Sequence, residues 1–261
     1  MHVSHRFYTP LRPPQGGNRL LVVLLILIAV GAGLAFGPAG LLPRRAVGSD
    51  SREALDRRAA SIAACRAQGL TVDPLVPPIE DSATAHARTA EETARRTIGI
   101  CIAASSALRM GPKAVAEQIH RYRADLFMTP EETAFVNAPS PSEGDRARFS
   151  WRIEQAWVML WALGYADQLR SPDAGCSSEE VIKTVAGRSL EELILGAHPR
   201  SLTSLLNEAD LTMRYDRAID DARSHGGLAP KGLNPDVVAE RHYAFNWLIG
   251  HRHEDYDHVT L

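Results

Sequence analysis

The chain has 261 residues, of which 45% are hydrophobic and 23% are charged, proportions typical of a globular protein and not of a disordered one. A formal net charge of −2 gives no electrostatic reason to expect a nucleic-acid partner. The three cysteines have no metal-like spacing, which argues against a zinc site or a disulfide framework, and no motif indicates a cofactor.

An uncharged apolar run at residues 20–42 is long enough to cross a bilayer as a helix. We expect a single-pass membrane anchor, preceded by a flexible basic leader at 1–19 and followed by a linker at 43–49. A cleaved signal peptide is the alternative, with Gly33-Leu34-Ala35 as its cleavage site. Arginines on both sides of the run leave the side of the membrane that the following domain faces undetermined.

Helix signals follow one another from residue 50 onward. Asp50 with Glu53 predicts a capping box, and a second one, Thr89 with Glu92, opens a buried helix to residue 110. Prolines make 71–81 extended instead of helical. Pro112 starts a helix to residue 123, and another short helix begins at Thr129. Residues 137–145 are expected to form a surface loop.

The second half of the chain predicts longer helices. Apolar side chains at helical spacing indicate a core helix over 149–164. Ser177 with Glu180 and Ser189 with Glu192 predict two capping boxes, and 201–224 forms a long amphipathic helix. A final helix runs from the N-cap Asn234 to a glycine at 250. No segment alternates as a strand does, so we predict one all-α domain at 50–261 with about eight or nine helices.

Three of these helices carry ionisable residues in mostly apolar surroundings. The ionisable residues are Arg152 and Glu154 in the helix at 149–164, Asp210, Arg214 and Asp221 in the helix at 201–224, and Glu240, Arg241 and His242 in the helix at 234–250. Asp210 and Arg214 lie four residues apart and can pair on one helical face. Arg152 and Glu154 diverge, as do Glu240 and Arg241, so each needs a partner from another helix.

Two interpretations of this charge set stay open. It is either a buried ion-pair network that fixes helix packing, or a pocket in which arginines hold an anion and His242 or Glu240 moves a proton. Trp151 points away from the core tryptophans of its helix and can line a groove. The tail at 251–258 contains imidazoles and carboxylates that suit a transition metal, but we favour a solvated tail and predict no metal site.

Three ordered blocks resemble the bacterial domain-of-unknown-function family 4272. They are Phe149-Ser150-Trp151-Arg152-x-Glu154 with Leu160-Trp161-Ala162-Leu163-Gly164; Asp210-Leu211-x-x-Arg214-Tyr215 with Asp221-Ala222-Arg223; and Asn234-Pro235-x-Val237-Val238-x-Glu240-Arg241-His242-Tyr243-Ala244-x-Asn246-Trp247-Leu248 with Tyr256-Asp257. The resemblance covers about 65–261. It implies a helical fold and a shared polar cluster that includes Trp151, Asn246 and Asp257, and it implies no established activity. Members of the family are expected to be soluble, so the apolar run at 20–42 is a departure.

The sequence therefore predicts a membrane-anchored all-α protein that acts as a non-enzymatic binding module for a protein partner. This prediction depends on plentiful polar anchors without a complete catalytic set. The alternative is an enzyme or small-ligand binder for an anionic substrate, with Arg152, Arg214 and Arg241 as anion holders and Glu240 or His242 as the acid or base.

Overall fold

The computed structural model describes residues 51–261, which belong to one compact unit. The predicted leader at 1–19, membrane segment at 20–42 and linker at 43–49 lie outside the described residues. Between residues 51 and 261, no helix combines the length and the apolar character that crossing a membrane requires.

The secondary structure of residues 51–261 consists of helices without any strand, which confirms the predicted all-α class. Its α-helices are α1 (Arg52–Ala67), α2 (Ala90–Ala107), α3 (Pro112–Tyr122), α4 (Pro130–Asn137), α5 (Glu143–Trp151), α6 (Ile153–Ala162), α7 (Ser178–Ala186), α8 (Leu190–Leu195), α9 (Leu202–Ser224) and α10 (Pro235–Leu248). A short 3-10 turn at Ala124–Leu126 lies between α3 and α4, and two more, at His251–His253 and Tyr256–His258, follow α10.

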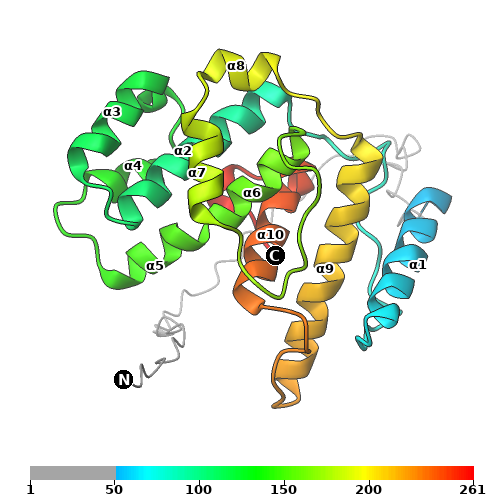
Figure 1. Cartoon of the computed structure of the whole chain (residues 1–261). Helices are drawn as coiled ribbons and strands as arrows, with labels where there is room; N and C mark the ends of the chain where they lie inside the picture. The colour runs from blue at the N-terminus through cyan, green and yellow to red at the C-terminus, as the bar shows by residue number, and fades with distance from the viewer. Residues whose placement is uncertain (1–50) are drawn as a thin grey trace, which may run out of the picture. The chain divides into compact units, whose positions relative to one another are not determined.

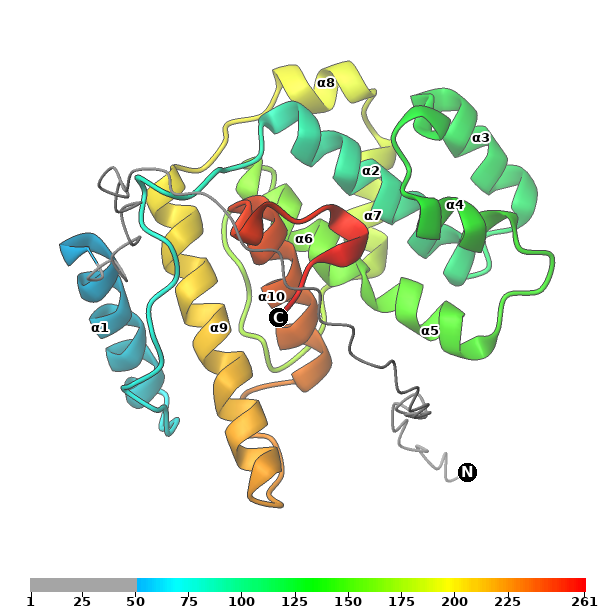
Figure 2. The same cartoon turned by 180° about the vertical axis from the view of Figure 1, so that it is seen from behind.

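Helix α6 lies at the centre of the domain, and all of its residues are buried. It packs between α2 and α10, and α10 in turn packs on α9, whose other side contacts α1 (Figure 1). Helices α3, α4 and α5 lie at the opposite end from α1 in both views (Figure 2). The largest hydrophobic cluster is built mainly from α2, α6 and α10, and two smaller clusters adjoin α9 and α5.

The predicted helix starts are largely confirmed because they depend on local hydrogen bonds. Thr89 and Ser189 form complete capping boxes with the glutamates three residues later. The Asn234 side chain accepts from the backbone N–H groups of Asp236 and Val237 at the start of α10. Ser177 caps α7 alone, since the carboxylate of Glu180 binds Arg170 instead.

Four expectations are wrong in detail. The first helix is capped by Ser51, whose hydroxyl accepts from the Ala54 N–H, and Glu53 binds Arg57 instead of closing a capping box. The expected loop at 137–145 is shorter because α5 already begins at Glu143. The expected helix at 149–164 is divided, with α5 ending at Trp151 and α6 beginning at Ile153. The buried helix expected to run to residue 110 ends at Ala107.

The C-terminal segment after α10 is packed against the domain, which corrects the expectation of a solvated tail. Tyr256 is buried, and His251 pairs with Glu80 in the connection between α1 and α2. Figure 2 shows this segment in red as it passes from the end of α10 across α6 towards α4. It therefore connects helices that are far apart in the sequence.

Candidate functional site: buried ion pairs and two concave surfaces

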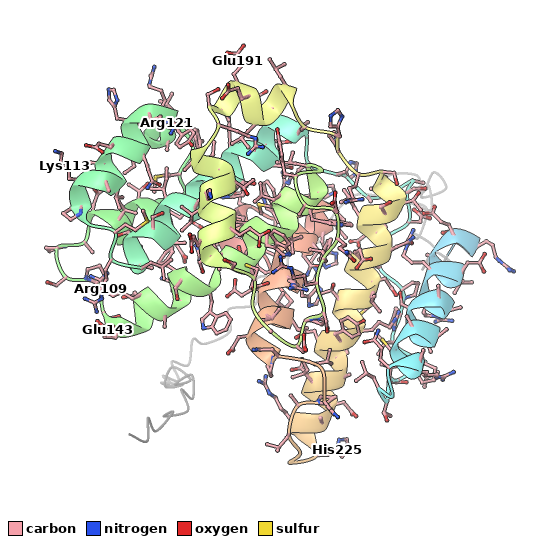
Figure 3. The ribbon with its side chains drawn as sticks, in the orientation of Figure 1. Arg109, Lys113, Arg121, Glu143, Glu191 and His225 are labelled. Atoms are coloured by element: carbon pink, nitrogen blue, oxygen red, sulfur yellow. The ribbon has the colours of Figure 1, made fainter. Side chains whose placement is uncertain are left out.

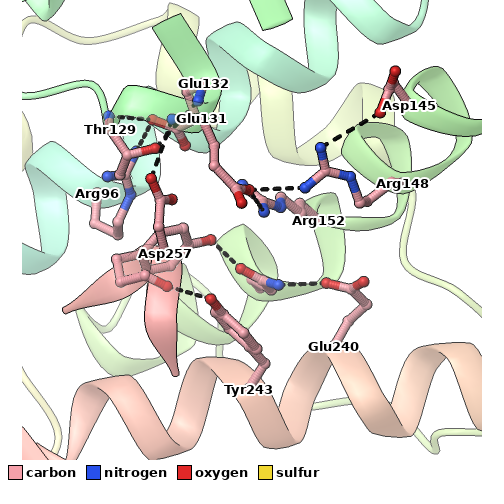
Figure 4. A network of polar contacts seen from close by, with 12 residues as sticks. Arg96, Thr129, Glu131, Glu132, Asp145, Arg148, Arg152, Glu240, Tyr243 and Asp257 are labelled. Carbon is pink, nitrogen blue, oxygen red and sulfur yellow. Dashed lines mark hydrogen bonds and ion pairs between the residues drawn. The ribbon is translucent and has the colours of Figure 1, made fainter. Parts of the chain in front are cut away.

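Arg152 lies at the junction of α5 and α6, and its guanidinium turns towards α4. Its Nη2 binds the Glu131 carboxylate at 2.7 Å, and Arg148 binds the same carboxylate oxygen at 2.8 Å (Figure 4). The Arg152 guanidinium also lies 4.5 Å from the centre of the Phe149 ring. Since the Arg152 side chain is only 8% exposed, this arginine fixes the junction of α5 and α6 onto α4.

A chain of hydrogen bonds connects the C-terminal segment to α10 through α6 (Figure 4). The Tyr256 hydroxyl donates to the Gln155 side-chain carbonyl, and the Gln155 amide donates to the Glu240 carboxylate. The Tyr243 hydroxyl of α10 donates to the backbone carbonyl of Tyr256. Burial raises the pKa of Glu240 to about 7, although Gln155 and the charge of Arg152 oppose the shift.

The pair Arg96–Glu132 joins α2 to α4 and was not predicted. Both side chains are buried, and the Arg96 guanidinium lies 4.3 Å from the centre of the Tyr256 ring. A Cβ atom at Gly99 would collide with the Arg96 guanidinium, so the missing side chain leaves room for this pair. An unexplained glycine in the middle of a helix, three residues after an arginine, is the signal that could have revealed it.

Glu154 and Arg241 form a second buried pair between α6 and α10. The Arg241 Nε atom lies 3.1 Å from Glu154 Oε2, and the side chains are 4% and 1% exposed, respectively. Glu154 also accepts from the Cys176 backbone N–H, and Arg241 Nη1 donates to the Arg170 carbonyl at 2.7 Å. The pair therefore attaches the loop at 163–177 to the two central helices.

Helix α9 carries two further buried contacts. The predicted pair Asp210–Arg214 is confirmed at 3.1 Å, and Arg214 also donates to the backbone carbonyls of residues 76 and 77. Asp210 accepts from the backbone N–H of residue 79, so the pair fastens the extended segment at 71–81 onto α9. His242 of α10 binds Asp216 of α9 at 2.9 Å.

The remaining predicted residues are dispersed. Asn246 donates to the Thr260 carbonyl at 2.8 Å, and Asp257 accepts from the Glu131 backbone N–H at 3.1 Å. Trp151 is 36% exposed at the end of α5, and Asp221 lies on the exposed end of α9. The predicted residues thus do not surround one pocket. Among the described residues, no group of three or more His, Cys, Asp or Glu side chains has an arrangement that could hold a metal.

A groove of about 550 Å³ lies between α2, α3 and the segment before α5. We call it the α3 groove, and it is lined by Ser106, Arg109, Gly111, Pro112, Val115, Ala116, Ile119, Val136, Asn137, Ala138, Pro139, Pro141 and Arg146. The exposed side chains of Leu108 and Met110 lie next to it in the chain. Figure 3 shows Arg109 beside Glu143 at this edge of the domain.

A second hollow of about 430 Å³, which we call the Arg241 cavity, lies between α9, α10 and the loop at 169–172. Its lining residues are Gln68, Leu169, Arg170, Ser171, Pro172, Glu208, Leu211, Thr212, Tyr215, Val238 and Arg241. Of the predicted cluster, only Arg241 belongs to this lining, whereas Arg214 and Asp221 line another cavity against the segment at 71–76.

These features define a helical domain in which ion pairs connect the packed segments. Few of the paired residues line its concave surfaces. The chain matches the model of the family described as "Domain of unknown function (DUF4272)" over residues 57–259, and it therefore belongs to this family. This confirms the resemblance seen in the three sequence blocks. No curated protein and no solved structure matches the chain.

Proposed function

We propose that the helical domain is a non-catalytic module that binds another protein through the α3 groove. The observation that carries this proposal is the mixed lining of the groove, in which the apolar side chains of Val115, Ile119 and Val136 lie beside two arginines. Two large apolar side chains, Leu108 and Met110, are about half exposed beside it. Concave apolar surfaces bordered by exposed apolar residues are typical of interaction sites.

The partner segment that suits this groove is apolar with acidic flanking residues. Arg109 and Arg146 line the groove, and Lys113 lies on the adjoining turn of α3. Glu143 offsets part of this charge by pairing with Arg109 and Arg146, whereas none of the ion pairs found within 51–261 involves Lys113. The two arginines in the lining favour a negatively charged partner over a basic one.

The buried charges support a binding role over a catalytic one. Apart from Trp151 and Asp221, every predicted site residue bonds to a different segment of the domain, as Arg152 does to α4 and His242 does to α9. Polar atoms that are occupied in such contacts are not available to a substrate. A shared anion site of Arg152, Arg214 and Arg241 is also disfavoured, because Arg214 and Arg241 line different cavities.

The proposal is tested with a photo-cross-linking amino acid placed at Ala116 of the full chain in its native cells. Ala116 is exposed on α3 and lines the groove, and the matched control position is Ala60, exposed on α1 at the other end of the domain. We expect one acidic partner to be cross-linked from position 116 and not from position 60.

Binding of that purified partner is then measured for Ala116→Glu and Ala60→Glu variants. A carboxylate in the groove should weaken binding at least about tenfold, and the control should leave it within about twofold. Equal cross-linking from both positions, or unchanged affinity of Ala116→Glu, would contradict a partner in the α3 groove.

We further propose that residues 20–42 hold this module at a membrane as a single-pass anchor. The length of the uncharged run and its apolar composition support the proposal. Attachment would concentrate the domain near partners at the same membrane, which raises the effective concentration for a weak interaction.

A further inference from the structure

Helix α1 carries a concave surface that the proposed protein partner does not use. The helix packs on α9, and both views show it at the edge of the described domain, at the opposite end from α3 (Figures 1 and 2). A hollow of about 270 Å³, which we call the α1 hollow, lies along this helix. Its lining includes the apolar residues Leu55, Ile62 and Pro74 together with Arg58 and Arg66.

The two arginines of the α1 hollow are accessible and lack a counter-charge. Arg66 is exposed and Arg58 is half-buried. The acidic residues of α1, Glu53 and Asp56, already pair with other arginines of the same helix. No ion pair or side-chain hydrogen bond within residues 51–261 involves Arg58 or Arg66. The hollow therefore presents two cationic groups to a ligand or surface outside the domain.

The turn beside the hollow presents an apolar side chain to the solvent. Leu75 directly follows the lining residue Pro74 and is 83% exposed. The Asp73 carboxylate accepts from the Leu75 backbone N–H at 2.8 Å, which holds the turn and offsets part of the positive charge nearby. Exposed apolar side chains next to arginines suit the boundary of a bilayer, where the cations meet anionic headgroups.

The place of α1 in the chain brings this surface close to the proposed membrane anchor. Residues 43–51 separate the predicted span at 20–42 from Arg52, the first residue of α1, and a linker of this length reaches at most roughly 30 Å. The stretch 43–67 contains six arginines against three acidic residues. Positive charge is thus concentrated in the part of the sequence that follows the span.

We propose that the α1 hollow docks the domain onto the surface of a bilayer that contains anionic lipids. Arg58 and Arg66 bind lipid phosphate groups, and Leu75 enters the boundary between headgroups and acyl chains. This inference rests on the proposed anchor, which supplies a proximity that two cations alone do not. In the docked position the α3 groove, at the opposite end of the domain, lies away from the bilayer and stays open to a protein partner.

Docking is tested on the purified full chain reconstituted into vesicles. An apolar, environment-sensitive fluorescent amino acid replaces Leu75, and the matched control replaces Leu195, which is 75% exposed on α8. Phosphatidylcholine brominated in its acyl chains is mixed in equal parts with phosphatidylglycerol or with unbrominated phosphatidylcholine. We expect bromine to quench the fluorescence at position 75 only in the vesicles with phosphatidylglycerol, and not at position 195 in either. Equal quenching at the two positions, or quenching at position 75 that does not depend on phosphatidylglycerol, would overturn the proposal.

Charge reversal then assigns the contact to the two arginines. Arg58→Glu combined with Arg66→Glu should abolish the quenching at position 75, because a negative hollow is repelled by the anionic surface. Lys113→Glu combined with Lys183→Glu reverses two exposed cations on α3 and α7 and should leave the quenching unchanged. Circular dichroism checks that both variants are folded. Undiminished quenching in the arginine variant would overturn the proposed docking surface.

Flotation of the same vesicles separates this inference from the anchor on which it rests. A spanning helix should carry the protein with both kinds of vesicle and in both charge-reversal variants, since it does not need the arginines of α1. Flotation without quenching at position 75 would overturn the docking and leave the anchor intact. Failure to float with the neutral vesicles would contradict the anchor and, with it, the docking that rests on it.

Discussion

Glu240 shows how one buried carboxyl couples the stability of this domain to pH. Its pKa is raised to about 7, chiefly by burial and secondarily by the charges of Asp236 and Glu154. In the unfolded chain the pKa of a glutamate is near 4.5, so the folded state binds the proton more tightly. The contribution of this residue to the free energy of unfolding is therefore complete below pH 4.5 and is lost as the pH rises towards 7.

We expect Glu240→Gln to remove this pH dependence, because an amide keeps an oxygen acceptor for Gln155 without ever becoming charged. When the pH rises from 5 to 8, the unfolding free energy of the unsubstituted protein should fall by about 1–3 kcal/mol more than that of the variant. Urea unfolding of both proteins at the two pH values measures the difference, with Glu191→Gln as the exposed control. An equal change in all three proteins would mean that Glu240 does not titrate in this range.

Helices α6 and α10 are joined by two adjacent contacts. Neighbouring residues of α6, Glu154 and Gln155, bind neighbouring residues of α10, Arg241 and Glu240, respectively. Successive residues on a helix point about 100° apart, so the two contacts lie on different sides of the helix–helix interface. Together they restrict both sliding and rotation of α10 against α6, a restraint that nonspecific apolar packing alone does not provide.

Removing one partner of the buried Glu154–Arg241 pair should lower the free energy of unfolding more than removing both partners. We expect Arg241→Met to lower the unfolding free energy by about 3–5 kcal/mol, because it leaves the Glu154 carboxylate buried without its cation. The double variant Arg241→Met with Glu154→Met should recover part of that loss.

Denaturant unfolding gives both values, and Arg217→Met is the control. Arg217 forms an exposed pair with Asp220 at 3.9 Å, and its loss should cost less than about 1 kcal/mol. A single Arg241→Met variant as stable as this control would contradict a structural role for the pair.

At the scale of the whole molecule, two of the concave surfaces of the helical domain, the α3 groove and the Arg241 cavity, are formed by different helices. Both are lined by apolar side chains together with polar and charged ones, such as Arg146 in the groove and Arg241 in the cavity. The core elements α2, α6 and α10 lie between them.

The predicted membrane segment is tested on the intact protein in its native cells. We expect the full chain to stay in the membrane pellet after extraction at alkaline pH, because an apolar span of this length does not leave the bilayer with peripheral proteins. A variant without residues 20–42 should move to the supernatant. If the mature protein lacks these residues, as mass spectrometry of its N-terminus would show, the segment is a signal peptide and not an anchor.

The sequence by itself determined the features that depend on local interactions. Capping residues such as Thr89 and Asn234, the spacing of Asp210 and Arg214, and the all-α class are all readable from neighbours within about one helical turn. The family followed from ordered blocks of residues, and the model match over 57–259 confirms it.

Only the tertiary structure decided which charged groups meet. The carboxylate that Arg152 binds comes from α4, the partner of His242 comes from α9, and Glu208 shares a cavity with Arg241. These contacts join residues that are distant in the chain, and a helical pattern specifies which face is buried without specifying the helix that covers it. The division of the 149–164 segment at Arg152 has the same origin, because the contacts of this side chain with α4 are made only in the folded domain.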